Sequence, residues 1–107
     1  MCIFCQIINH EMPAERVFEN EKMIAIKDIK PSAPIHILII PKKHIESIAC
    51  LDEGDISLIG DLVWRAKKIA EELGVAEKGY KLIFNTGQEG GQIVPHIHLH
   101  LLAGKQF

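Results

Sequence analysis

The chain has 107 residues, of which 48% are hydrophobic and 24% charged, a balance typical of one globular domain with a modest core. A net charge of −2 gives no broad basic field for duplex nucleic acid. No basic leader precedes an apolar run, and no stretch reaches the roughly 20 apolar residues of a membrane span. We therefore expect one domain over residues 1–107, located in the cytoplasm, with no nucleic-acid and no membrane partner. The three cysteines, an odd number, fit a reducing compartment.

Short elements are expected in the first half of the chain. They are a helical turn over 3–10, strands over Arg16–Glu19 and Met23–Asp28, and a central strand over Ile35–Ile40. Asn20–Glu21 supplies the turn between the first two strands. The two prolines of the segment 30–34 exclude a regular element there, and Pro41 ends the central strand.

One long helix dominates the second half, over about residues 55–73, because apolar residues recur there at three- and four-residue steps. Asp52 is a suitable N-cap, and Gly74 a suitable end. Two strands are predicted after it, over Lys81–Asn85 and His96–Leu102, with a glycine-rich loop over 86–92 between them. Strands and helices without regular alternation indicate an α+β fold with an antiparallel sheet.

Three histidines, His96, His98 and His100, alternate along the last predicted strand, which would align their rings on one face. One metal ion does not easily take all three. His96 and His100 would lie roughly 13 Å apart at a rise of about 3.3 Å per residue, whereas zinc–nitrogen bonds are about 2.0–2.1 Å long. Nucleophilic or acid–base catalysis is favoured, and the preceding glycines could turn main-chain N–H groups toward a phosphate. The alternative is a histidine stripe on a wet sheet face.

Cys2 and Cys5 have the C-x-x-C spacing of zinc ligands, but such a pair is only half of a site. A redox dithiol is the alternative, although no βαβ pattern follows the pair. Unliganded thiols are the third interpretation. Cys50 fits no ligand set and is expected to be a small, buried apolar residue.

The segment NTGQEGGQIVPHIHLHLLAGKQF resembles the signature of the histidine triad (HIT) nucleotide-binding family, His-φ-His-φ-His-φ-φ with φ apolar, and residues 96–102 fit every position. The resemblance extends through CIFCQII, MPAERVFEN, DIKPSAPIHILIIPKKHI and KGYKLIFNTG, and it is strongest to the phosphoramidase-like branch of small homodimers. It implies a HIT-like antiparallel sheet with one long helix packed on it, a short N-terminal helix, and a homodimer.

The resemblance also implies roles for individual residues. His98 would attack the α-phosphorus of a nucleotide, giving a nucleotidyl-imidazole that water hydrolyses. His100 would hydrogen-bond the phosphate oxygens and stabilise their charge, and His36 would be an orienting or proton-relay partner of the triad. The implied substrate-binding residues are Asp28 at the ribose hydroxyls, Asn85 near the leaving group, Gly91, Gln92 and the N–H of Ile93 at the phosphate, Ile3, Phe4 and Ile26 around the base, and Lys27.

Two of these positions depart from the family pattern. Ile93 stands where relatives often carry Ser or Thr, and Lys27 stands where some relatives have His beside the ribose. Both departures leave the base and leaving-group preference open. Relatives with the N-terminal pair bind a structural zinc, which implies Zn²⁺ held by Cys2, Cys5, His44 and His96, with no metal required for the nucleophile.

The implied activity is that of a nucleotide hydrolase or transferase similar to purine nucleoside phosphoramidases. It would cleave a phosphorus–nitrogen or phosphoanhydride bond at the α-phosphate of an AMP-type substrate, with adenosine phosphoramidates favoured. A dinucleoside polyphosphate hydrolase is the nearest enzymatic alternative. A nucleotide-binding regulator with incidental turnover, or a zinc-stapled interaction module that leaves His98 idle, would represent other classes of protein.

Overall fold

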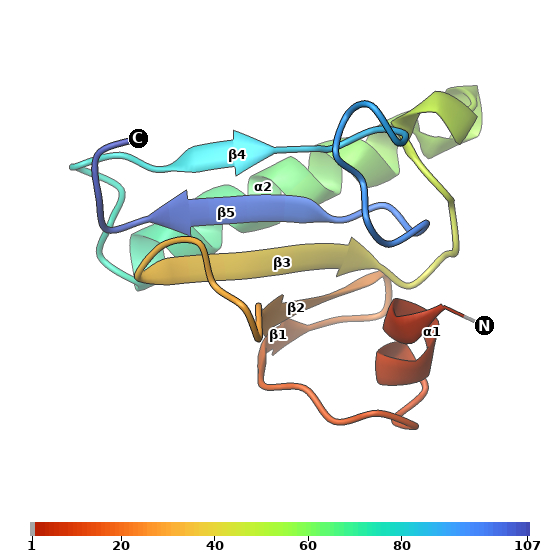
Figure 1. The fold of residues 1–107 in the computed structure, drawn as a ribbon, viewed down its shortest axis with the longest axis horizontal. Helices are drawn as coiled ribbons and strands as arrows, with labels where there is room; N and C mark the ends of the chain where they lie inside the picture. Colours follow the sequence, from red (N-terminus) through yellow and green to blue (C-terminus); the bar gives the residue numbers. More distant parts are fainter. Residues whose placement is uncertain (1) are drawn as a thin grey trace.

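The computed structural model describes residues 2–107 and forms a five-stranded antiparallel sheet in the order β1-β2-β3-β5-β4 (Figure 1). In chain order the elements are α1 (Ile3–Ile8), β1 (Arg16–Glu19), β2 (Met23–Lys27), β3 (Ile35–Pro41), two 3₁₀ turns (Ile48–Cys50 and Glu53–Asp55), α2 (Ile56–Glu72), β4 (Lys81–Ile83) and β5 (Leu99–Ala103). No helix within the described residues is long and apolar enough to cross a membrane.

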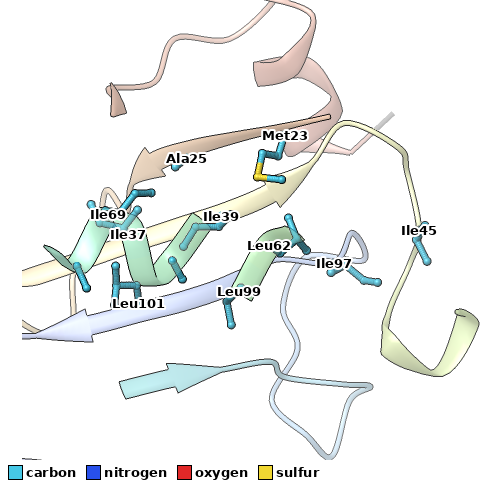
Figure 2. Packing of buried hydrophobic residues seen from close by; sticks show 12 residues of the cluster. Met23, Ala25, Ile37, Ile39, Ile45, Leu62, Ile69, Ile97, Leu99 and Leu101 are labelled. Atoms are coloured by element: carbon cyan, nitrogen blue, oxygen red, sulfur yellow. The ribbon is translucent and has the colours of Figure 1, made fainter. Parts of the chain in front are cut away.

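The two faces of the sheet bury different apolar clusters, because successive residues of a strand point to opposite sides. On one face α2 packs over the sheet, and Leu62 of α2 lies in one buried cluster with Ile39 and Leu101 (Figure 2). On the other face Phe4 and Ile7 of α1 join a cluster with apolar residues of β2 and β3. His36 and His100 alternate with residues of the α2 cluster, so both histidines face the α1 side.

The long helix matches its prediction, with a local refinement at each end. Asp52 caps the 3₁₀ turn before α2, accepting from the Gly54 N–H at 2.8 Å and forming a reciprocal capping box with Asp55. Gly74 follows the last turn at φ +75°, a conformation that glycine adopts without strain. The helix therefore begins and ends where the polar and glycine signals of the sequence indicate.

The last two strands are shorter than predicted. β5 begins at Leu99 rather than His96, and β4 ends at Ile83 rather than Asn85. Pro95 has no N–H to donate, and the Ile97 N–H donates at 2.8 Å to the carbonyl of Ile45, outside the sheet. The chain therefore joins the ladder only after His98, at Leu99, and the three histidines do not form one regular row. Two further elements are also shorter than predicted. The N-terminal helix ends at Ile8 rather than residue 10, and β2 ends at Lys27 rather than Asp28.

Candidate active site and metal cluster

His98 is a buried imidazole whose tautomer is fixed by the main chain. Its Nδ1 lies 2.8 Å from the carbonyl oxygen of His96, and a carbonyl only accepts, so Nδ1 carries the proton. The Nε2 atom of the neutral ring therefore keeps its lone pair, and no group among residues 2–107 hydrogen-bonds to it. Phe4 packs edge-on against the ring, with centroids 5.0 Å apart. The site thus presents one oriented, neutral nitrogen nucleophile.

His36 and His100 form a second hydrogen-bonded unit beside His98. His36 Nε2 lies 2.9 Å from His100 Nδ1 and 3.5 Å from a carboxylate oxygen of Asp28. The rings of His98 and His100 have centroids 4.9 Å apart. We call Asp28, His36, His98 and His100 the histidine cluster; its residues come from the loop after β2, from β3, from β5 and from the position just before β5. All three catalytic histidines predicted from the sequence therefore lie together.

Burial keeps the imidazoles of His98 and His100 neutral near pH 7. Removal of water around the ring lowers the pKa of His98 below its ordinary 6.5, because the charged form loses most on burial. The same effect, reinforced by the neighbouring His98 and His36, lowers the pKa of His100 to about 4. A neutral ring is the form that can attack an electrophile, so the burial of His98 preserves its nucleophilic state.

The glycine-rich loop is tighter than the sequence indicates. A Cβ at Gly90 would lie 2.2 Å from the carbonyl oxygen of Thr86, so only glycine fits there. The N–H groups of Gly91 and Gln92 are bonded inside the loop, at 3.1 and 3.0 Å, rather than open to an anion. The N–H of Ile93 has no such bond among the described residues. Of the three positions expected at a phosphate, this one keeps an available main-chain donor.

Two polar side chains expected at the substrate, Asn85 and Gln92, make hydrogen bonds that hold this loop. Asn85 donates through Nδ2 to the carbonyl of Gly90 at 2.9 Å. Gln92 accepts from the Gly87 N–H at 2.9 Å and donates to the carbonyls of Glu46 and Val94 at 2.6 and 3.0 Å. These contacts fix the segment that leads into His98.

The residues expected around a base are divided by the structure. Phe4 and Ile26 share the buried apolar cluster on the histidine side of the sheet, while Ile3 is 37% exposed. Lys27 alternates with Ile26 and points to the other face, and its Nζ pairs with Glu15 at 2.6 Å. Ile29, which the sequence did not single out, is 90% exposed directly after Asp28. The sequence feature that could have indicated Ile29 is an apolar residue in a polar loop, next to the acid expected to bind substrate.

Four ligand-type side chains meet between α1 and the start of β5, although they are distant in sequence. Cys2 Sγ lies 3.3 Å from His96 Nδ1, Cys5 Sγ lies 3.3 Å from His44 Nδ1, and the two Nδ1 atoms are 3.0 Å apart. All four ligand atoms lie within 4.8 Å of one another. We call these residues the Cys2His2 cluster, and they are the four that the sequence grouped.

The donor set of this cluster fits a metal ion of tetrahedral geometry. Bonds of about 2.3 Å to sulfur and 2.0–2.1 Å to nitrogen place ligand atoms roughly 3.3–3.8 Å apart, close to the distances seen here. His96 Nε2 donates to the carbonyl of Pro41 at 2.8 Å, so its Nδ1 offers a lone pair to the cluster. Burial and the neighbouring Cys2 raise the pKa of the Cys5 thiol, so a cation is needed to hold it as thiolate. Cys50 is exposed rather than buried, which corrects that prediction.

Comparisons with known proteins decide the family. Residues 1–106 match the family model described as scavenger mRNA decapping enzyme C-term binding. The purine nucleoside phosphoramidase of Escherichia coli K12 is 45% identical over 103 residues, covering 96% of this chain and 87% of that protein. A HIT family hydrolase from Legionella pneumophila superposes with a TM-score of 0.97 at 50% identity, covering 99% of this chain and 95% of that one. The chain belongs to the histidine triad family.

The family assignment confirms the α+β fold expected from the resemblance, with its single long helix and short N-terminal helix. This chain is a nucleotide-binding HIT family hydrolase. A Zn-bound histidine triad protein from Mycobacterium smegmatis is also similar, at 32% identity and a TM-score of 0.83, covering 97% of this chain and 75% of that one.

Proposed function

We propose that this HIT hydrolase is a purine nucleoside phosphoramidase-like enzyme that releases AMP from adenosine 5′-phosphoramidates through a covalent nucleotidyl-His98 intermediate. The observation that carries the proposal is the geometry of His98: Nδ1–H is bonded to the His96 carbonyl, and Nε2 is neutral and without a partner among the described residues. The name of the E. coli relative supports the choice of substrate class.

The chemistry follows from the proton positions. The Nε2 lone pair of His98 forms a bond to the α-phosphorus, and the phosphorus–nitrogen bond breaks with its electron pair leaving on the amine, which takes up a proton. Water then attacks the same phosphorus, gives up a proton, and expels Nε2. His36 Nε2 and His100 Nδ1 are hydrogen-bonded, and with the shared proton on His36 the Nε2–H of His100 would be the donor that stabilises charge on the phosphoryl oxygens. The Ile93 N–H adds a second donor.

Asp28 is proposed to accept hydrogen bonds from the ribose hydroxyls. One of its oxygens already accepts from the Lys30 N–H at 2.8 Å, which fixes the orientation of the carboxylate. Replacing Asp28 by Asn is expected to lower kcat/KM for a ribonucleotide substrate about tenfold, since hydrogen bonds to a charged group contribute about 1.5–3 kcal/mol. A 2′,3′-dideoxy substrate serves as the control. Equal losses on both substrates would contradict a role at the ribose.

We propose that the Cys2His2 cluster holds one structural zinc ion. The sulfur and nitrogen donors and their spacing support zinc, and the similar M. smegmatis protein is Zn-bound. All four coordination positions would be filled by protein atoms. The ion would therefore link residues 2–5 to the segments at His44 and His96 and take no part in the reaction. Thiolate ligands also fit a reducing compartment, and we place the protein in the cytoplasm.

A homodimer is proposed from the open edge of the sheet. β4 lies at that edge and carries Leu82, which is 36% exposed, and Val63 and Ile56 of α2 are 41% and 69% exposed. An uncovered strand edge and exposed apolar side chains favour pairing with a second copy. Sedimentation should give twice the monomer mass, and Leu82→Lys should shift the equilibrium toward monomer. A wild-type protein that sediments as monomer at micromolar concentration would contradict this assembly.

Substrate choice is the direct test of the proposed function. We expect turnover of a fluorogenic adenosine phosphoramidate with kcat/KM at least tenfold above that for diadenosine polyphosphates. A reversed preference would assign the chain to the polyphosphate hydrolases. AMP binding without turnover of either substrate would identify a regulatory nucleotide-binding protein.

The pH dependence of kcat/KM should reflect the lowered pKa of His98. Because the folded protein holds this pKa below 6.5, most of the His98 rings are still neutral and reactive at pH 6.5. The rate is therefore expected to fall to half of its maximum only below pH 6.5, as His98 takes up a proton. Stopped-flow rates on a substrate without titrating groups would measure this. A half-maximal rate at or above pH 6.5 would contradict the neutral, buried nucleophile.

A further inference from the structure

The molecule contains a second group of metal-ligand side chains, inside the histidine cluster. Ligand atoms of Asp28, His36 and His100 lie within 4.8 Å of one another, as do those of the Cys2His2 cluster. The closest nitrogen pair is similar in both places, at 2.9 Å between His36 and His100 and 3.0 Å between His44 and His96. Ligand spacing alone therefore does not distinguish a metal site from a catalytic one in this protein.

The positions of the ring protons do distinguish them. In the Cys2His2 cluster the Pro41 carbonyl holds the His96 proton on Nε2, away from the cluster, and leaves Nδ1 as a ligand. In the histidine cluster the main chain donates a hydrogen bond to the ring instead of accepting one from it. The main-chain N–H of Ser32 donates to His36 Nδ1 at 3.0 Å, so Nδ1 must accept. The proton of neutral His36 then lies on Nε2, the atom that a metal would need.

We propose that the Ser32 main-chain N–H is a positioning donor that sets the proton order of His36 and His100. With Nδ1 of His36 engaged by Ser32, its Nε2–H points to His100 Nδ1, which accepts. His100 then carries its own proton on Nε2, outside the pair. Reversing the order would put a proton on His36 Nδ1, facing the N–H of Ser32. The Ser32 amide therefore favours the arrangement in which His100 donates.

This donor has two consequences, one for catalysis and one for metal binding. The catalytic one rests on the proposed function: His100 meets the phosphoryl oxygens with a neutral N–H. The other is independent of it: His36 Nε2 is not free to ligate, so Asp28, His36 and His100 do not take the zinc that fits the Cys2His2 cluster. One main-chain hydrogen bond thus separates a catalytic cluster from a metal site of similar spacing.

The test replaces the amide N–H of residue 32 by an ester oxygen, through incorporation of lactic acid at that position. The matched control is Ser32→Ala, which keeps the N–H and has the same side chain as the ester variant. Histidine ¹⁵N spectra report the ring protons, zinc titration reports the ions bound per chain, and phosphoramidate turnover reports catalysis. Cobalt(II) substitution separates the two sites, because thiolate ligands give a charge-transfer band that an Asp–His–His site lacks.

For Ser32→Ala we expect the Nε2–H form of His36 and His100, and one zinc per chain. For the ester we expect a mixture of tautomers at His36, a second zinc that inhibits turnover, and a kcat about tenfold lower with KM little changed. Spectra, metal count and kcat equal to the control would overturn the proposal. Altered spectra and a second zinc in a protein that hydrolyses no phosphoramidate would support it while refuting the proposed function.

If the ester variant does not fold, the wild-type protein still decides the matter. A scalar coupling across the hydrogen bond between the Ser32 amide nitrogen and His36 Nδ1 is expected in its ¹⁵N spectra. A proton on Nδ1 of His36 at neutral pH would overturn the proposal.

Discussion

Replacing His98 by alanine is expected to lower phosphoramidate hydrolysis by a factor on the order of 10³ or more, while AMP binding changes little. The loss should be large because no neighbouring ring can substitute for His98. His100 Nδ1 accepts from His36, and the resulting tautomer carries a proton on Nε2. Single-turnover rates and equilibrium binding of AMP, measured on the same preparation, separate the chemical step from affinity.

His10→Ala is the matched control for this variant, because His10 is an exposed histidine on the turn after α1, outside the histidine cluster. Its turnover should equal that of the wild type. If His98→Ala kept a tenth or more of the wild-type rate, direct attack by water would replace the covalent route as the explanation.

The largest effect on stability is expected from the double change Cys2→Ser and Cys5→Ser. The protein should lose about one zinc per chain. An ion present at 100 times its dissociation constant stabilises the folded state by about 2.7 kcal/mol, so the Tm should fall by about 10–20 °C. Elemental analysis and calorimetry of the purified protein measure the two quantities. The physical reason is that the proposed ion would join residues 2–5 to His44 and His96, which lie far along the chain.

Cys50→Ser provides the control for this pair, since Cys50 is exposed and outside the Cys2His2 cluster. It should change neither the zinc content nor the Tm. A wild-type protein purified without chelators that carries no metal would refute the zinc site, and so would a Tm that the double change leaves unaltered.

The elements with strong periodic signals were predictable from the sequence. The apolar steps of α2, the β-branched run of β3 and the stop at Gly74 all lie close to their predicted places. The start of β5 was not predictable from the sequence, because His96–His100 alternates like a strand. In the structure Pro95 and the hydrogen bond from Ile97 to Ile45 keep the residues before Leu99 out of the ladder. A pairing across 52 residues of chain leaves no local trace in the sequence.

The residue types of the site were predictable, but their hydrogen-bond states were not. The family resemblance grouped the four cluster cysteines and histidines correctly, and it brought His36 to His98 and His100. It did not show that the N–H groups of Gly91 and Gln92 are used inside their own loop. Nor could it assign the ring protons, which depend on main-chain groups at Ser32, Pro41 and His96.

The stereochemistry at phosphorus tests the covalent mechanism most directly. An adenosine phosphoramidate made chiral with one sulfur on the α-phosphorus is hydrolysed in ¹⁸O-labelled water, and the configuration of the product is determined. Attack by His98 followed by attack of water makes two displacements, so the account predicts overall retention, with a nucleotidyl group on His98 in acid-free quenched samples. Inversion would show a single displacement by water and would contradict the role of His98 as nucleophile.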